Sequence, residues 1–239
     1  MRKLNHGAMI LVLLLLATVA PTQAGKPIRI DENSDWWSVI RENDSDEDLK
    51  PQDLDIDASN FRVLGITVGS DDLEAVQKKL GPAHVVTRGD ASTGRSQICY
   101  AGVDGRTYAA FEVGEVQYGF YLFDRGPKWL GQNECAKSNL VASTLKTNSG
   151  LHLGQTRTEV ERILGKPTAS RQNGDWVYFR QIRKKTSAAN LRKAREYYSN
   201  LSDKEFHDNY DYFDLSVYIV ARFSDGQLVY LGLSRSETY

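Results

Sequence analysis

Alternation of apolar and polar side chains is clearest near the C-terminal end of the chain. Every second residue there is apolar: Leu215, Val217, Ile219, Ala221 and Phe223. The residues between them form the other face: Ser216, Tyr218, Val220 and Arg222. A period of two predicts a strand with one buried face and one solvent-exposed face.

Turn residues divide the rest of this pattern into further strands. We predict strands over 97–101, 107–113, 116–123, 176–182 and 228–234. Asp104-Gly105 and Gly114-Glu115 separate the first three, and Asp225-Gly226 precedes the last, as is typical of hairpin turns. Consecutive strands joined by such turns predict antiparallel pairing.

A helical period appears twice, in two segments offset by 84 or 85 residues. Each copy has a glycine-bounded turn, an amphipathic segment and a glycine followed shortly by proline: 65–69, 70–80 and 81–82, then 150–154, 155–164 and 165–167. The apolar residues of each segment share one helix face: Leu73, Val76 and Leu80, then Val160, Ile163 and Leu164. Thr156 with Glu159 predicts a capping box, and Asp71 with Glu74 predicts a weaker equivalent. The pattern therefore predicts two copies of one unit.

A helix followed by strands in each copy predicts an α+β fold with two tandem repeats, each a helix packed on a small antiparallel sheet. The expected boundaries are 61–134 for the first module and 135–239 for the second. An insertion, 183–212, interrupts the second module. Its first half is basic and its second half is acidic and tyrosine-rich, and Ser202 with Glu205 predicts a capping box. We expect a helical hairpin that covers a sheet edge, with a binding element as the alternative.

The N-terminal residues, 1–24, have the features of a secretory signal peptide. Two basic residues precede an apolar stretch of about a dozen residues, which is shorter than the roughly 20 needed to span a bilayer. We expect cleavage after Ala24 and a secreted or periplasmic protein with no transmembrane span. The following segment, 25–60, is polar and acidic, so we predict a flexible arm.

Charge and cysteine count narrow the class of protein. Removing Arg2 and Lys3 from the 30 basic residues leaves 28, against 31 acidic ones, which argues against a nucleic-acid partner. The sequence has two cysteines, Cys99 and Cys135, and an even count in an exported chain predicts a disulfide between them. Two unpaired buried thiols are the alternative.

The sequence contains no motif typical of an enzyme. Its four histidines are scattered, so no metal-ligand spacing can be assembled, and it has no nucleophile elbow, phosphate loop or dinucleotide fingerprint. We expect no catalytic, metal-binding or cofactor-binding residues. Because catalytic groups can converge from distant positions, an unrecognised hydrolase stays open as an alternative.

Aromatic and charged residues on the predicted strands are candidates for a protein interface, where such side chains concentrate binding energy. The candidates are Tyr108, Glu112, Tyr121, Trp176, Tyr178, Tyr218 and Arg222. The alternative is that most of these residues belong to the core.

The helix that ends in Leu-Gly-x-Pro and is followed by Trp-x-Tyr resembles a known module. It stands here as Gly154–Pro167 with Trp176-Val177-Tyr178, and in weaker form as Gly69–Pro82 with Ile98-Cys99-Tyr100. It is similar to the family that unites the small outer-membrane assembly lipoproteins (SmpA/OmlA) with the β-lactamase inhibitory protein. That resemblance implies a non-enzymatic protein that presents a curved sheet or its loops to another protein. The chain departs from the lipoproteins in lacking a lipid-bearing cysteine near the signal.

These observations together predict an exported, non-enzymatic protein-binding module of the bacterial envelope or extracellular space, which presents paired sheet faces to a protein partner. The alternative is an envelope structural protein that contacts cell wall or anionic membrane through the basic insertion.

Overall fold

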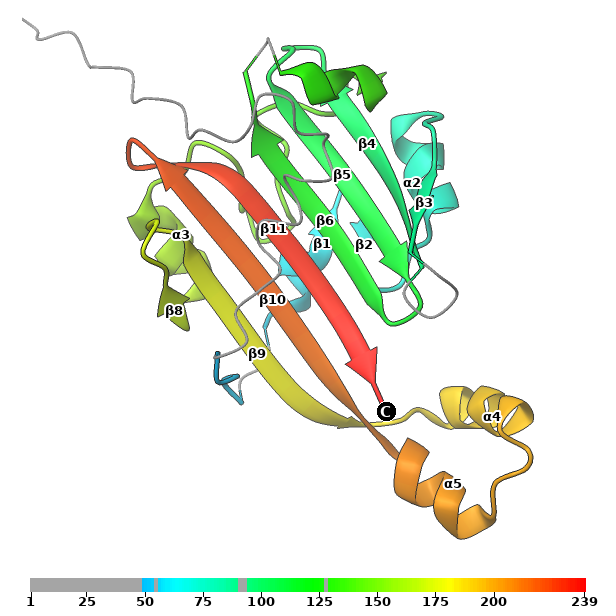
Figure 1. Ribbon diagram of the computed structural model, residues 1–239. Coiled ribbons are helices and arrows are strands. Elements are labelled where there is room, and N and C mark those ends of the chain that lie inside the picture. Colours follow the sequence, from blue (N-terminus) through cyan, green and yellow to red (C-terminus); the bar gives the residue numbers. More distant parts are fainter. Residues whose placement is uncertain (1–48, 54–55, 90–93, 127–128) are drawn as a thin grey trace, which may run out of the picture.

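The computed structural model describes residues 49–53, 56–89, 94–126 and 129–239. The predicted signal peptide and most of the predicted acidic arm lie outside these ranges. The described part is mixed α+β and is built on one large antiparallel sheet (Figure 1).

The sheet has nine strands. Eight lie side by side and pair antiparallel in the order β3 (Val86–Arg88), β4 (Arg95–Gly102), β5 (Thr107–Gly114), β6 (Gln117–Asp124), β11 (Gln227–Thr238), β10 (Tyr212–Ser224), β9 (Trp176–Lys185) and β8 (Ala169–Ser170). The ninth, β7 (Ala136–Ser138), pairs parallel with β4. Each strand predicted from the sequence is present, with most ends shifted by one to four residues.

The two small sheets expected from the sequence are joined into this single sheet. The seam is the pairing of β6 with β11, in which Phe120 lies opposite Leu233 and Leu122 opposite Leu231. Both strands bury side chains on both of their faces, as central strands do. The sheet is therefore continuous from β3 to β8.

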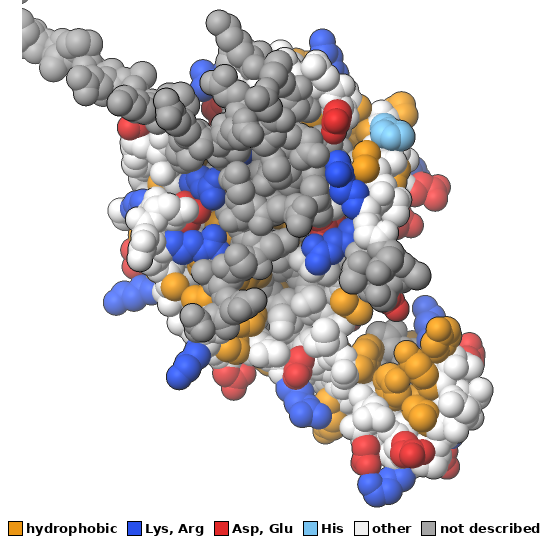
Figure 2. Space-filling view, viewed as in Figure 1, with side chains coloured by type: hydrophobic (Ala, Val, Ile, Leu, Met, Phe, Trp, Pro, Cys, Tyr) orange, Lys and Arg blue, Asp and Glu red, His pale blue; other side chains and the backbone are white. Residues whose placement is uncertain are grey.

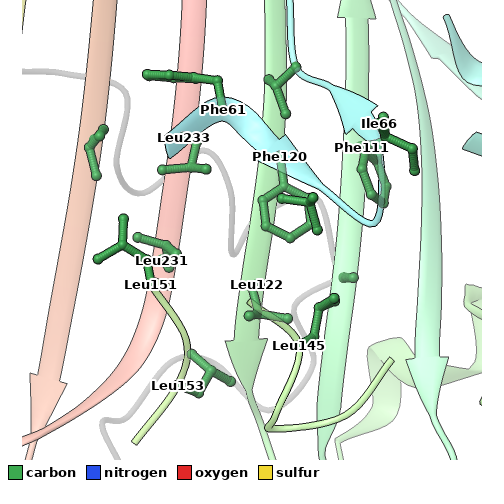
Figure 3. Packing of buried hydrophobic residues seen from close by; sticks show 14 of the residues in the cluster. Phe61, Ile66, Phe111, Phe120, Leu122, Leu145, Leu151, Leu153, Leu231 and Leu233 are labelled. Carbon is green, nitrogen blue, oxygen red and sulfur yellow. The ribbon is translucent and has the colours of Figure 1, made fainter. Parts of the chain in front are cut away.

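One face of the sheet, called here the first face, carries the main hydrophobic core. Two short helices pack on it, α2 (Leu73–Leu80) and α3 (Arg157–Leu164), together with the hairpin of β1 (Arg62–Val63) and β2 (Ile66–Thr67). Figure 3 shows side chains of this layer meeting those of the sheet: Phe61, Ile66, Leu145, Leu151 and Leu153 lie against Phe111, Phe120, Leu122, Leu231 and Leu233. The short η1 (Ala58–Phe61) brings Phe61 into this core.

The helix caps correct one prediction and confirm another. Asp72, not Asp71, caps α2, because its carboxylate accepts the Ala75 N–H at 2.9 Å, while Asp71 accepts the Thr67 N–H instead. The capping box of α3 is present as predicted, formed by Thr156 and Glu159.

Two helices fill the predicted insertion between β9 and β10. They are α4 (Ala188–Tyr197) and α5 (Asp203–Tyr210), and Ser202 with Glu205 forms the expected capping box. With their connections they form a lobe, residues 186–211, that projects beyond one end of the sheet (Figures 1 and 2). The hairpin extends away from the strands, so it does not cover a sheet edge as we expected.

Candidate functional site

The other face of the sheet, called here the second face, is the candidate site. It does not bear α2 and α3, and its hydrophobic cluster receives only Trp129 and Cys135 from outside the strands among the described residues. Register places the side chains of this face in rows across the strands. One row holds Phe179, Tyr218, Ser234 and Gly119, and the next holds Gln181, Ser216, Ser236 and Gln117.

Five of the seven predicted interface residues share the second face: Tyr108, Glu112, Tyr121, Tyr218 and Arg222. Only Tyr218 is half-buried, and the other four are buried, as in the alternative that most of the candidates belong to the core. Val220, also predicted to face solvent, is buried beside them. These side chains therefore support the face more than they offer contact atoms.

The burial of Arg222 is explained by its counter-charge. Its Nε lies 3.1 Å and its Nη2 3.0 Å from Asp175 Oδ2, and Asp175 precedes β9. The guanidinium also lies 5.5 Å from the centre of the Tyr230 ring. A bidentate carboxylate and an aromatic face satisfy a guanidinium that would otherwise be costly to bury.

Glu112 is held in the same way on the other half of the sheet. Its Oε2 accepts from Gln97 Nε2 at 2.9 Å, and its Oε1 lies 3.3 Å from Arg95 Nη1. Since Glu112 is buried and Arg95 is partly exposed, the carboxylate contributes to fixing β4 and β5 together. It is not placed to meet a partner directly.

Tyr108 belongs to an aromatic cluster at one end of the second face. Its ring lies 4.7 Å from that of Trp129 and 5.6 Å from that of Phe123, centre to centre. Its hydroxyl is 3.1 Å from Gln132 Oε1, an acceptor on η2 (Leu130–Glu134). Burial, together with the nearby Asp104 and Asp124 carboxylates, raises the pKa of Tyr108 above its usual range, so the ring stays neutral at physiological pH.

A disulfide ties the connection after η2 to the sheet. Cys99 on β4 is bonded to Cys135, with the two Cα atoms 4.6 Å apart. The predicted pairing of Cys99 with Cys135 is therefore confirmed. The bond holds the segment that carries Trp129 against the second face.

Two tyrosine rings lie over glycines in the middle of this face. A Cβ added to Gly119 would come within 2.6 Å of the Tyr121 hydroxyl, and one added to Gly232 within 2.9 Å of the Tyr230 hydroxyl. Each ring thus lies along its own strand, over the glycine two residues away. Because these glycines have no side chain, the two rings can lie close to the backbone at the centre of the face.

Beside these rings the second face is hollowed. The hollow has a volume of about 180 Å³ and is lined by Gln117, Phe179, Ser216, Tyr218, Ser234 and Ser236. All six side chains are half-buried, so they reach solvent. Arg171 donates to the Tyr218 hydroxyl at 2.7 Å and orients that ring at the rim. Of these six residues, only Tyr218 was predicted from the sequence. The alternation of the serines with apolar residues along β10 and β11 is the signal that could have indicated the others.

The remaining two predicted interface residues lie on the first face. Tyr178 is fully buried in the main core, and burial raises its pKa well above the usual range. Trp176 is half-buried, with its ring 5.3 Å from that of Phe223 and 5.2 Å from the guanidinium of Arg157 on α3. The expectation that both residues face a partner on the sheet is wrong, because the strand alternation turns them toward the helices.

Comparison of the chain with family models, curated proteins and solved structures finds no match. The resemblance to the SmpA/OmlA and β-lactamase inhibitory protein family therefore rests on the sequence motifs alone. In the described ranges, no three His, Cys, Asp or Glu side chains gather in a way that could hold a metal ion. Over the same ranges, none of the helices combines the length and the apolar character needed to cross a bilayer.

Proposed function

We propose that this chain is an exported, non-enzymatic protein that binds another protein through the second face of its sheet. The observation that carries the proposal is the hollow beside Tyr218, with its rim of hydroxyl and amide groups around two aromatic rings. Tyr and Phe supply contact area at low entropic cost, and serine and glutamine hydroxyls and amides supply adaptable hydrogen bonds. A hollow of this kind takes one side chain of a partner as an anchor.

Rigid support strengthens this proposal. The Arg222–Asp175 pair links β10 to the residue before β9, and both strands line the hollow. The Gln97–Glu112 hydrogen bond joins β4 to β5, in the row of side chains that continues from Tyr218 and Ser234 across Gly119. A surface that is ordered before binding loses less entropy when the partner docks.

The arrangement of the two halves is compatible with the tandem modules of the family that the sequence resembles. One core-packed helix and four antiparallel strands of the described sheet lie on each side of the β6–β11 seam: α2 with β3 to β6, and α3 with β8 to β11. The strand β7 adds to the first half and the lobe adds to the second. We propose that the halves are copies of one module, and that the hollow lies near the seam because the partner contacts both.

The proposal predicts a position-specific cross-link. A photo-reactive benzoylphenylalanine at Ser234 should form a covalent adduct with one discrete envelope or extracellular protein. The same group at Lys79, exposed on α2, should form none. Ser216→Arg, which fills the hollow, should reduce the adduct formed from Ser234 about 10-fold or more, since a lost central contact is worth at least about 1.4 kcal/mol.

Ser170→Arg is the matched control, because it makes the same change at an exposed serine of the edge strand β8. Circular dichroism and thermal unfolding of each variant separate lost binding from lost fold. Adducts of equal yield at Ser234 and Lys79, or an adduct that Ser216→Arg leaves unchanged, would refute binding at the second face.

A further inference from the structure

The lobe is an unusual element because little of it is packed. The helix α4 has no buried residue, and α5 buries only Phe206. An isolated helix shorter than about 12 residues is marginal in water, and tertiary packing normally supplies the missing stability. A ten-residue helix with no buried residue therefore points to a further contact surface.

Aromatic side chains gather on this lobe and at its base. Ring contacts connect Tyr197 to Tyr198, Tyr198 to Tyr210, and Tyr210 to the C-terminal Tyr239. Tyr197 is 81% exposed and Tyr239 55%, and Figure 2 shows hydrophobic side chains clustered on the lobe. Tyrosines with an apolar ring and a polar tip are enriched where proteins meet the interface of a membrane.

Basic residues frame the same region. Arg183, Lys185, Arg192 and Lys193 form no ion pair with a carboxylate in the part of the chain that the structure describes. All four are exposed. Lys193 and Tyr197 are four residues apart on α4, so they share one face of the helix.

The acidic residues of the lobe are mostly engaged within it. Asp203 pairs with Arg195, Asp208 with Lys204 and Asp211 with His207, while Glu205 completes the capping box of α5. Glu196 is the remaining acid of the lobe. The side chains left to attract a ligand are therefore predominantly cationic and aromatic, which is complementary to an anionic surface.

We propose that the lobe docks on the surface of an anionic lipid bilayer, with the tyrosines at the interface and the basic side chains against the headgroups. Long basic side chains and aromatic rings on a projecting helical hairpin fit peripheral binding, in which the protein lies on the bilayer without crossing it. This site is separate from the second face, so the protein could hold a protein partner while resting on lipid.

Sedimentation with vesicles tests the proposal. The chain should co-sediment with vesicles of equal parts phosphatidylglycerol and phosphatidylcholine, and not with phosphatidylcholine alone. Each basic residue near an anionic bilayer contributes roughly 5-fold to partitioning, so Arg192→Glu with Lys193→Glu should lower the partition coefficient about 25-fold or more at low salt. Tyr197→Ser should cause a smaller drop.

The matched control is Lys78→Glu with Lys79→Glu, which reverses two consecutive exposed lysines at the end of α2 and should leave sedimentation unchanged. Because the apolar stretch near the N-terminus would itself bind lipid, all variants must share the same N-terminus, as checked by mass. Equal binding to both vesicle types, no binding, or equal losses in both double variants would overturn the proposal. Binding of polyglutamate without binding of vesicles would instead indicate an acidic protein partner.

The two proposals can fail independently, because their variants change different parts of the molecule. Absence of vesicle binding would not bear on the second face, and loss of the cross-link at Ser234 would not bear on lipid binding by the lobe.

Discussion

Two buried tyrosines on the first face differ in a single hydrogen bond. The Tyr100 hydroxyl donates to the Gly81 carbonyl at 2.7 Å, whereas the Tyr178 hydroxyl has no hydrogen-bond partner among the described residues. Burial raises the pKa of Tyr100 to about 12 and raises that of Tyr178 as well. Both phenols are therefore held in the neutral form by the fold.

The raised pKa values of these two tyrosines predict that the folded state loses stability at alkaline pH. A pKa that is higher in the folded state than in the unfolded state stabilises the fold fully below the unfolded value of 10.0, and the stability is lost as pH rises toward about 12. For Tyr100 the shift corresponds to at most about 3 kcal/mol. Urea unfolding between about pH 9 and pH 12 should show the decline.

Two phenylalanine variants separate the contributions. Tyr100→Phe should cost about 1 kcal/mol at neutral pH, because a hydrogen bond is lost, and should flatten the alkaline decline. Tyr178→Phe should be neutral or stabilising at neutral pH. A stability that stays constant across the alkaline range in the unmodified chain would contradict the assignment.

The sequence pattern predicts which face of a strand a side chain occupies, but not whether that side chain is exposed. The alternation correctly placed Tyr218 and Arg222 on one side of β10. It could not show that Arg222 is buried, because the counter-charge, Asp175, lies 47 residues away and approaches only through the pairing of β9 with β10. The helix-facing positions of Trp176 and Tyr178 were ambiguous because their neighbours are also apolar or aromatic.

At the scale of elements, α3 and α5 begin with the same capping box but differ in what they support. Thr156→Ala should lower the global free energy of unfolding by about 1 kcal/mol, because α3 contributes Val160 to the main core. Ser202→Ala should instead speed amide exchange within α5 and leave the melting temperature nearly unchanged. Thermal unfolding and hydrogen exchange check the two outcomes, and equal shifts in melting temperature would contradict them.

Local chemistry determined the elements that the sequence predicted well. Asp225 and Gly226 both have positive φ, 51° and 78°, as the hairpin turn between β10 and β11 requires. The Gly81 and Gly165 caps likewise end their helices where expected. Pairing of β6 with β11 has no local signal, since more than a hundred residues separate the strands. The one sequence feature that favours this pairing is that both strands carry apolar residues on two faces, as central strands do.

At the scale of the molecule, the disulfide closes a loop between residues 36 positions apart. Replacing Cys135 with Ser should lower the free energy of unfolding by up to about 4 kcal/mol on the chain-entropy account, while the sheet still forms. Thermal unfolding of the variant should match that of the reduced unmodified chain. Two reactive thiols per unreduced, denatured chain would refute the bond.

The seam between β6 and β11 also imposes an order on assembly. As the chain is made or moved from its N-terminal end, β3 to β6 can pair as soon as they are available, but the strand that pairs with β6 is β11, which begins more than a hundred residues after β6 ends. Until residues 227–238 arrive, β6 presents an open row of amide and carbonyl groups that any other extended chain could join. The central pairing of the described sheet therefore forms only after the strands on both sides of it have been made, and the yield of folded protein depends on how long the edge of β6 stays unpaired.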